Sequence, residues 1–410
     1  MRSKIIESVA IGAGQGPLQR LGRPVGAATA ALVLALGAGA CASGADAGSG
    51  PIAVGAVSTL SGPVTFPEAS AAARAVFDDV NARGGINGRR ISFTAADDKG
   101  DPSTGALAAR DVIQNKHAVA IAGGASLIDC QVNGPLYERY RITSIPGTGV
   151  DPGCFISPGI SPVNTGPYFG TTLTLYYASE YLKMQKLCGF FSIIGGTGRA
   201  YRDGVVRWSK LTGKRLLIDD RSLSANTTDY TPYILRARAA GCQGVFFNGT
   251  EPMAVGWVKA AQAQNVTGVK WLFLASTYTS QAAEAFGPAA KDVLALSEFE
   301  PYTDTSSEAN QDWRTTMARH HVPLTSFAQG GYLAATHLVT VLRGIKGDIT
   351  REFVTRALKG LRPLPSAMAG TPFAFGPGDA HASNLAGKFV RPERGGWTVL
   401  TRDWVRLPNA

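Results

Sequence analysis

The stretch VNARGGINGRRI, from Val80 to Ile91, is followed closely by ADDKGDP, from Ala96 to Pro102, and these two segments decide the fold. Gly84 can end a helix in the left-handed conformation, because it has no Cβ that would clash. Asn87-Gly88 can then turn the chain tightly into the next strand. The sequence therefore predicts a helix, a turn and a strand in direct succession.

The segments on either side continue this alternation. Before the stretch, apolar residues at spacings of three and four predict one buried stripe on a helix. They are Ala69, Ala72, Ala73, Val76, Phe77 and Val80. After it, Asp101-Pro102 is typical of a helix N-cap with proline in the first turn, beginning a helix that runs toward Ile113. With strands expected at 52–58, 89–96, 117–122 and 142–146, the pattern predicts a parallel sheet covered on both faces.

A Gly/Pro-rich passage from Pro146 to Gly166 separates this unit from a second one with the same rhythm. A helix is expected at about 167–184, and strands at 187–194, 214–220, 242–248, 270–275 and 292–298. Three later helices, at about 305–319, 327–343 and 350–360, have no sheet of their own and must pack on an existing one. Short strands are expected at 371–375, 387–391 and 396–400.

The first 41 residues have the layout of a secretory signal: a basic stretch, an apolar run from Val25 to Ala40, and then Cys41. A membrane-spanning helix is the weaker interpretation, because the run contains four glycines or threonines and no basic stop-transfer flank follows it. Removal of residues 1–40 leaves 370 of the 410 residues, more than one compact core usually encloses, so two lobes are expected.

Ala38, Gly39 and Ala40 before Cys41 resemble the lipobox of bacterial lipoproteins. The resemblance implies a signal peptide at 1–40, a lipid-modified Cys41 and a tether at 41–50. Ala38 departs from the leucine that is usual in the lipobox. The alternative is ordinary cleavage nearby, with Cys41 left as a free thiol.

The composition indicates a folded chain, since 45% of the residues are hydrophobic and 17% are charged. The formal net charge is +10, and residues 1–40 hold four basic residues and one acidic residue, which leaves an excess of seven on the rest. The basic residues are scattered, so a nucleic-acid groove is not expected. The excess positive charge has two functional explanations, an anionic ligand or a negatively charged cell envelope as partner. The alternative is that the composition is simply rich in arginine.

Four cysteines follow Cys41, and an even number in an exported chain predicts disulfides. No CxxC unit suggests zinc binding or thiol redox work. Cys188 and Cys242 each open an apolar run that is typical of a buried parallel strand, which places both at the same end of one sheet. We therefore expect the pairs Cys130–Cys154 and Cys188–Cys242.

The paired motifs at 80–102, with SGP at Ser61 to Pro63, resemble the N-terminal signature of the branched-chain amino-acid (Leu/Ile/Val) type periplasmic binding proteins of ABC transporters. The resemblance extends along the mature chain through GGAS (123–126), IPGTG (145–149), GRAYRDG (198–204), TDYTPYILRARAAGCQGVFF (228–247) and FAQGGYLAA (327–335). It implies an α/β fold with two Rossmann-like, doubly wound lobes joined by a three-stranded hinge. Lobe one is then 51–166 plus 302–362, and lobe two is 167–301 plus 363–410.

The resemblance places a ligand site at strand-end loops of both lobes, since solutes in open α/β sheets bind outside the carboxyl ends of strands. The implied positions are Thr65, Phe66, Ala125, Ser126, Thr148 and Gly149 on lobe one, and Tyr201, Thr250, Glu251 and Thr277 on lobe two. Ser126 and Thr148 resemble positions that hold a ligand carboxylate. The alternative is that each hydroxyl only caps its own helix and does not contact a ligand. Tyr201 resembles a lid over the ligand, and core packing is the alternative.

Thr277 departs from the family pattern. Amino-acid-binding relatives usually have an acidic residue there to pair with the ligand ammonium, because a buried cation without a partner is costly. Glu251 is the candidate substitute, and a solvated glutamate at a helix start is the alternative. The departure favours a carboxylic acid, aromatic acid, amide or other small polar solute over a branched-chain amino acid.

Other functional classes lack their motifs. The segment FFSIIGGTGRAY, followed by Asp219 and Asp220, suggests a dinucleotide-dependent oxidoreductase, but Tyr201 stands where that fingerprint needs its third glycine. No P-loop and no G-x-S-x-G nucleophile motif is present, and the five histidines form no spaced metal set. We predict no enzymatic activity, no metal and no cofactor.

The sequence thus predicts an extracytoplasmic, lipid-anchored, monomeric protein that binds a small solute between two lobes. Through the family resemblance, its expected partners are the permease and ATPase subunits of an ABC importer. A sensory ligand-binding module with the same clamp is the alternative, because closure around a ligand would be identical and only the partner would differ.

Overall fold

The computed structural model describes residues 50–193, 197–375, 381 and 384–408. The predicted signal peptide, Cys41 and nearly all of the predicted tether lie outside these residues. Within the described part of the chain, no helix has the length and apolarity needed to cross a membrane.

The first sheet has four parallel strands in the order β2-β1-β3-β5. The strands are β1 (Ile52–Ser58), β2 (Ile91–Asp97), β3 (Ala120–Ala122) and β5 (Ser144–Ile145). The helices between them are α1 (Pro67–Ala82), α2 (Pro102–Arg110) with the π-helical turn η1 (Asp111–Asn115), and α3 (Asp129–Arg139). A small parallel pair, β4 (Ala125–Ser126) and β6 (Thr148–Gly149), follows β3 and β5, and α4 (Gly153–Ile156) comes next.

The second sheet has eight strands. Its main path runs β13-β12-β11-β10-β9-β7-β8, and β14 pairs with β12. The strands are β7 (Leu187–Ser192), β8 (Ile218–Leu223), β9 (Gly244–Phe247), β10 (Lys270–Phe273), β11 (Val293–Ser297), β12 (Ala386–Glu393), β13 (Gly396–Val399) and β14 (Val405–Arg406). Its helical segments are α5 (Gly166–Tyr176) with η2 (Tyr177–Tyr181), α6 (Gly198–Thr212), α7 (Thr231–Ala239), α8 (Glu251–Ala263), η4 (Ala275–Thr277), α9 (Ser280–Ala285) and η5 (Gly287–Asp292).

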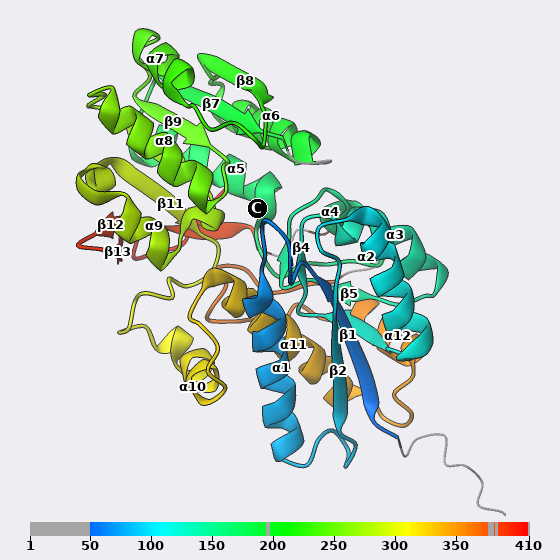
Figure 1. Ribbon diagram of the computed structural model, residues 1–410. Helices are drawn as coiled ribbons and strands as arrows, with labels where there is room; N and C mark the ends of the chain where they lie inside the picture. Colours follow the sequence, from blue (N-terminus) through cyan, green and yellow to red (C-terminus); the bar gives the residue numbers. More distant parts are fainter. Residues whose placement is uncertain (1–49, 194–196, 376–380, 382–383, 409–410) are drawn as a thin grey trace, which may run out of the picture. The chain divides into compact units, whose positions relative to one another are not determined.

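Helices cover both faces of each sheet (Figure 1), because consecutive residues of a buried strand point in opposite directions. In β7, Phe190 packs in the core shared with α7 and α8, while Phe191 packs in the core shared with α5 and α6. In the first sheet, the consecutive residues Ala120 and Ile121 of β3 likewise pack in two different cores. These runs of consecutive apolar residues are the signal from which the doubly wound α/β class was predicted, and the class is confirmed.

The three late helices are α10 (Gln311–Arg319), α11 (Ser326–Gly344) and α12 (Arg351–Lys359), and they return to the first sheet as expected. Helix α11 packs along α1 and β3, and α12 packs against β3. Asp79 on α1 binds Arg319 and His320 at the end of α10, with a distance of 2.8 Å to the His320 Nε2. The chain therefore passes between the two sheets three times: after α4, after β11, and between α12 and β12.

The stretch that decides the fold has the predicted local structure. Gly84 has φ 95°, and Asn87 and Gly88 have φ 52° and 77°, which are left-handed values. The turn is closed by a bridge between Ile86 and Arg89. Asp101 caps α2, because its Oδ1 accepts a hydrogen bond of 2.8 Å from the Thr104 N–H.

Some predicted boundaries were wrong. The strand expected at 214–220 lies at Ile218–Leu223, and the helix expected from 305 begins at Gln311, after the short 3-10 turn η6 (Glu308–Asn310). The segment 371–375 forms no strand, and contributes only an isolated bridge between Phe373 and Leu364. The first two corrections fall at element ends, where local pattern is weakest, whereas the third removes a whole expected strand.

Both predicted disulfides are present. Cys130 at the start of α3 is bonded to Cys154 in α4, and Cys188 in β7 is bonded to Cys242, which precedes β9. Strands β7 and β9 are paired neighbours, so Cys188 and Cys242 do lie at the same end of one sheet. Cys130, Cys154 and Asp151 lie close enough together to hold a metal ion, but both sulfur atoms are used by the disulfide.

Candidate functional site

Each sheet has one point at which the strand order reverses. In the first sheet, β1 leads to β2 on one side, whereas β3 leads on toward β5 on the other side, so the switch point lies between β1 and β3. In the second sheet, β7 leads to β8 on one side and β9 leads to β10 on the other, so the switch point lies between β7 and β9. The carboxyl ends of strands that flank such a switch point leave a crevice between their loops, which is where α/β proteins bind ligands.

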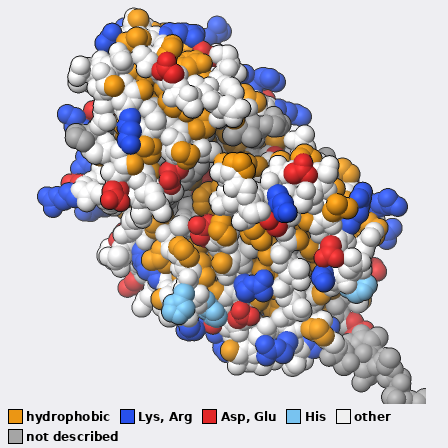
Figure 2. Space-filling model, viewed as in Figure 1, with side chains coloured by type: hydrophobic (Ala, Val, Ile, Leu, Met, Phe, Trp, Pro, Cys, Tyr) orange, Lys and Arg blue, Asp and Glu red, His pale blue; other side chains and the backbone are white. Residues whose placement is uncertain are grey.

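A cavity of about 490 Å³ lies at both switch points, and its lining comes from the two sheets and from the crossovers. The first-sheet side supplies Val64 and Phe66 after β1, and Phe327 at the start of α11. The second-sheet side supplies Ser192 at the end of β7 and Asn248 after β9. This volume is in the range of small-molecule sites. Figure 2 shows a hollow in this face of the molecule, bordered by acidic side chains.

The charged side chains that line the cavity are all acidic. They are Glu68, Glu251 and Glu298, and no lysine, arginine or histidine of the described residues is part of the lining. The chain as a whole has the opposite charge, with 40 basic and 30 acidic residues. The electrostatic character of the cavity is therefore set locally, against the net charge of the protein.

Glu298 is the most buried of these acids, with 7% of its surface exposed. Its Oε1 accepts a hydrogen bond of 2.6 Å from the Gly166 N–H and a longer one of 3.3 Å from the Asn164 Nδ2. Burial raises the pKa of Glu298 to about 7, although both hydrogen bonds favour the charged form. Glu298 follows β11 and Asn164 precedes α5, so this contact joins two of the three crossovers.

On the second-sheet side, Asn248 holds the ends of β7 and β9 together. Its Oδ1 accepts from the Ser192 N–H at 2.7 Å, and its Nδ2 donates to the Ser192 carbonyl at 2.8 Å. Tyr201 on α6 also lines the cavity, and burial raises the pKa of its hydroxyl while a hydrogen bond with Asn248 opposes the rise. Glu251 begins α8 and accepts a hydrogen bond from the Thr279 hydroxyl.

The predicted site residues divide into two groups. Seven of them line the cavity: Thr65, Phe66, Thr148, Gly149, Tyr201, Thr250 and Glu251. Three are not part of its lining: Ala125, Ser126 and Thr277. Thr277 is fully buried, and its hydroxyl has no hydrogen-bond partner among the described residues.

The Ser126 hydroxyl is used within the protein. It donates to Asp98 and accepts from the N–H groups of Ile128 and Asp129, at 3.1 and 3.0 Å, where α3 begins. The backbone N–H groups that were expected to bind a ligand carboxylate also donate hydrogen bonds within the protein. The Ala125 N–H donates to the Ser58 hydroxyl, that of Thr148 to the Gly124 carbonyl, and that of Gly149 to the Asn164 Oδ1.

Sequence reasoning missed Asn164, Ser192, Asn248 and Glu298. Three of them follow the rule that was applied to other loops, since each lies at or just after the end of a parallel strand. Glu298 was assigned to the last position of a predicted strand at 292–298, whereas β11 ends at Ser297. A boundary error of one residue therefore hid the most buried acid of the cavity.

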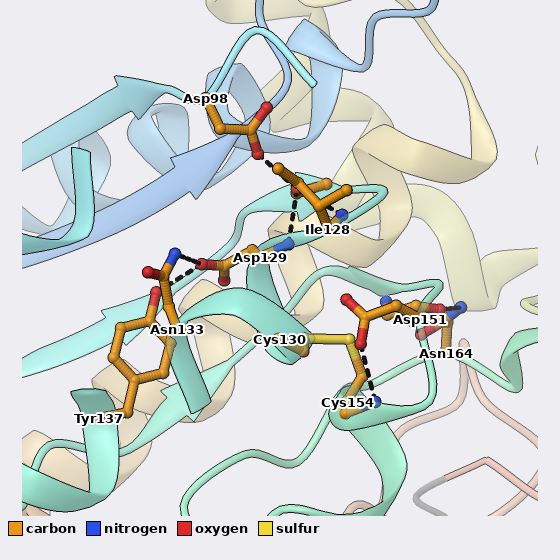
Figure 3. Close-up of a disulfide and its surroundings, with 12 residues drawn as sticks. Asp98, Ile128, Asp129, Cys130, Asn133, Tyr137, Asp151, Cys154 and Asn164 are labelled. Atoms are coloured by element: carbon orange, nitrogen blue, oxygen red, sulfur yellow. Dashed lines mark hydrogen bonds between the residues drawn. A yellow bond between two sulfur atoms is a disulfide. The ribbon is translucent and has the colours of Figure 1, made fainter. Parts of the chain in front are cut away.

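Asp129 and Asp151 are buried acids on either side of the Cys130–Cys154 disulfide (Figure 3). Asp129 accepts hydrogen bonds of 2.7 Å from the Asn133 amide and from the Tyr137 hydroxyl. Burial raises the pKa of Asp129 to about 7, more than these hydrogen bonds lower it, and burial raises the pKa of Asp151 to about 6. Both folded-state pKa values lie above the value near 3.9 of an unfolded aspartate.

These shifts predict that the protein loses stability as the pH rises. The folded state holds protons that the unfolded state has released, so the contribution is complete below about pH 4 and is lost as the pH reaches about 7. For Asp129 we expect a loss on the order of 4 kcal/mol over this window. Asp129→Asn keeps the acceptor for Tyr137 without the titration, so its unfolding free energy should fall less steeply than that of the wild type.

Urea unfolding at a series of pH values from 4 to 8 measures this difference. The control is Asp78→Asn, because Asp78 lies on the exposed side of α1. Parallel pH profiles for Asp129→Asn and the wild type would show that Asp129 does not titrate as described.

Comparisons with known proteins agree with this architecture. A sequence profile of the family described as periplasmic binding protein matches residues 51–391. An amino acid binding protein of Pseudomonas aeruginosa is 25% identical over 199 residues, which are 46% of this chain and 51% of the relative. The aligned part therefore spans about half the length of that relative.

Two solved structures illustrate the structural similarity. The branched-chain amino acid transporter substrate-binding protein of Streptococcus pneumoniae, in complex with isoleucine, matches with a TM-score of 0.73 and 15% identity, over 87% of this chain and 99% of the other. A fatty acid ABC transporter substrate-binding protein from Thermomonospora curvata matches with a TM-score of 0.73 and 18% identity, over 88% and 97% of the two chains. At these identities the matches show the fold.

Proposed function

Because the chain belongs to the periplasmic binding protein family, we propose that it is an extracytoplasmic solute-binding protein of an ABC importer. It captures an amino acid or a related small molecule between two lobes and performs no chemistry on it. The lobes are 51–166 with 302–362, and 167–301 with 363–410.

The observation that carries the proposal is the position of the cavity. Its walls come from the switch points of both sheets, and its floor includes Asn164 and Glu298 on two crossovers. A solute in this position contacts both lobes and the segments about which they can rotate. Binding then favours the closed arrangement by the difference in affinity between the closed and open forms.

Closure changes the surface that the protein offers to a membrane permease, whose ATPase subunits drive import. Cys41 carries a lipid anchor that keeps the protein at the membrane, and the protein acts as a monomer. These parts of the proposal rest on the layout of residues 1–50 and on the family.

A thermal-shift screen of residues 42–410, the mature chain without Cys41, tests the proposal. A bound solute stabilises the folded state in proportion to the logarithm of its concentration over Kd, so an amino acid, dicarboxylate, aromatic acid or amide should raise Tm. An increase with a nicotinamide nucleotide and with none of these solutes would instead favour an oxidoreductase.

Tyr201→Ala is expected to weaken binding of a solute found in the screen by at least about tenfold, because a buried aromatic side chain that packs on a ligand contributes more than 1.4 kcal/mol. Isothermal titration calorimetry measures the change. Tyr181→Ala is the matched control, since Tyr181 is 53% exposed and does not line the cavity. Unchanged affinity in Tyr201→Ala would remove Tyr201 from the site.

A further inference from the structure

We propose that the solute is a cationic amine with an apolar body, that its ammonium group binds Glu298, and that binding does not require a carboxylate on the solute. This inference rests on the proposed function, because it names the solute class of the same cavity.

The first argument is the charge of the cavity. Glu68, Glu251 and Glu298 line it, and the described lining includes no basic side chain to neutralise them. A cavity with low-dielectric walls and charges of one sign concentrates ions of the opposite sign. An anionic solute would enter against this potential, whereas a cationic solute is attracted by it.

The second argument is the unused capacity of Glu298. A carboxylate has about four acceptor positions. The Oε1 of Glu298 accepts from Gly166 and Asn164, while its Oε2 has, among the residues that the structure describes, only a contact of 3.4 Å with the Asn164 Nδ2. A buried carboxylate is costly without a counter-charge, so an ammonium group at Oε2 supplies the interaction that the protein leaves unmade.

A separate observation places a second polar group at the cavity. Ser192 is 2% exposed and lines the cavity, and its hydroxyl has no hydrogen-bond partner among the described residues. Buried hydroxyls are normally satisfied, so an unpartnered one beside a cavity indicates a ligand group that completes it. A hydroxyl can accept a hydrogen bond from an ammonium group or an amide.

The third argument concerns the carboxylate anchor expected from the sequence. The Ser126 hydroxyl caps α3, and the backbone N–H groups of Ala125, Thr148 and Gly149 all donate within the protein. A solute carboxylate would have to break one of these hydrogen bonds to find a backbone donor there, which leaves it the neutral Thr148 hydroxyl in the lining. Glu298, by contrast, offers a full counter-charge to a cation.

The apolar body of the solute follows from the side chains that the first-sheet side contributes to the cavity. Val64, Phe66, Leu127 and Phe327 line the cavity on the first-sheet side, and the Phe66 and Phe327 rings lie 4.8 Å apart. A wall with two aromatic rings favours a flat apolar group. An aryl-substituted amine combines this group with the charge that Glu298 requires.

Three probes that share one phenylpropyl frame separate the possibilities: L-phenylalaninamide, which is cationic, L-phenylalanine, which is zwitterionic, and 3-phenylpropanoate, which is anionic. Calorimetric titration of the full mature chain is expected to give the lowest Kd for L-phenylalaninamide. We expect 3-phenylpropanoate to bind at least about 30-fold more weakly, a difference of about 2 kcal/mol. Equal or tighter binding of 3-phenylpropanoate overturns the proposal.

Glu298→Gln tests the residue itself. Glutamine keeps an acceptor for the Gly166 N–H but has no charge, so affinity for L-phenylalaninamide should fall at least about 30-fold. Glu284→Gln, on the exposed side of α9, is the control and should bind like the wild type. An affinity of Glu298→Gln within about threefold of the wild type overturns the assignment, and the probe series tests the solute class even where this variant does not fold.

A pH readout distinguishes a direct ion pair from a structural role. The pKa of Glu298 near 7 means that a bound ammonium must displace its proton. The affinity for L-phenylalaninamide should therefore rise as the pH goes from 5 to 6.5, a range in which the amino group of the probe, with a pKa of about 7.7, stays protonated. Glu68 and Glu251 also face the cavity, and Glu300, paired with Lys388 of β12, lies on the same crossover. Loss of the pH dependence in Glu298→Gln assigns it to Glu298, and its persistence overturns that assignment.

Failure of this inference differs from failure of the proposed function. If none of the three probes binds, the solute from the thermal-shift screen replaces them. A solute without a cationic group overturns the inference and leaves the proposed function standing. A screen in which no solute raises Tm counts against both.

Discussion

Gly331→Ala is expected to lower the free energy of unfolding by about 3 kcal/mol, because the added methyl group has no space. Gly331 lies in α11 where this helix crosses α1, and a Cβ atom built on it would lie 1.9 Å from the Ala69 carbonyl oxygen. That oxygen belongs to the backbone of α1 and cannot rotate away. The two helices must separate, which disturbs the core between α11 and the first sheet.

Gly344→Ala in the same helix is the matched control. Gly344 is exposed at the end of α11, and its Cβ would have no neighbour within 4 Å. Alanine there should be neutral or raise the free energy of unfolding by about 0.5–1 kcal/mol, since alanine is the better helix former. Urea unfolding measures both variants, and equal stability of Gly331→Ala and Gly344→Ala would show that α1 and α11 are not in close contact.

The fold could be predicted because its signals are local. Runs such as CGFFS in β7 place alternate residues in two different cores, and this needs no knowledge of distant residues. Glycines with a left-handed φ and an aspartate that caps a helix act within a few residues. The Cys188–Cys242 pair followed from the same logic, because two strands of one parallel sheet begin at the same end.

The site could be predicted only in part, because its hydrogen-bond partners are distant in sequence. Asn164 and Glu298 meet across 134 residues, and Ser126 meets Asp98 across 28. A strand-end position predicts that a residue lies near the crevice, as for Thr148 and Tyr201, which line it. It does not show whether the hydroxyl is already used, and in Ser126 it caps α3.

The acidic charge of the cavity could not be predicted from the sequence pattern either. The missing acid at Thr277 pointed away from an ammonium ligand, with Glu251 as the candidate substitute. In the structure Glu251 lines the cavity at the start of α8 and accepts from Thr279, while Glu298 supplies a second and more buried carboxylate from a crossover. A crossover has no periodicity that marks which of its residues face a cavity.

Lys388→Met is expected to lower the free energy of unfolding by about 3–5 kcal/mol, because it leaves a buried carboxylate without its cation. Lys388 in β12 lies 2.8 Å from the Oε2 of Glu300, and the two side chains are 10% and 8% exposed. Glu300 is on the crossover after β11, where its carbonyl also accepts from Gln329 at 2.7 Å. The ion pair therefore joins the second sheet to a crossover that α11 also holds.

The double variant Lys388→Met with Glu300→Gln tests whether the stability lost in Lys388→Met comes from the unpaired charge of Glu300. It removes both charges at once, so it should recover most of the stability lost in Lys388→Met. Arg356→Met is the control, since its pair with Glu352 is exposed at 66% and 72% and should contribute at most about 0.5 kcal/mol. Calorimetric unfolding of the wild type, Lys388→Met, Glu300→Gln and the double variant gives the coupling energy. A loss in Lys388→Met no larger than that in Arg356→Met would show that water reaches Glu300, and that this crossover is less tightly packed than its buried ion pair indicates.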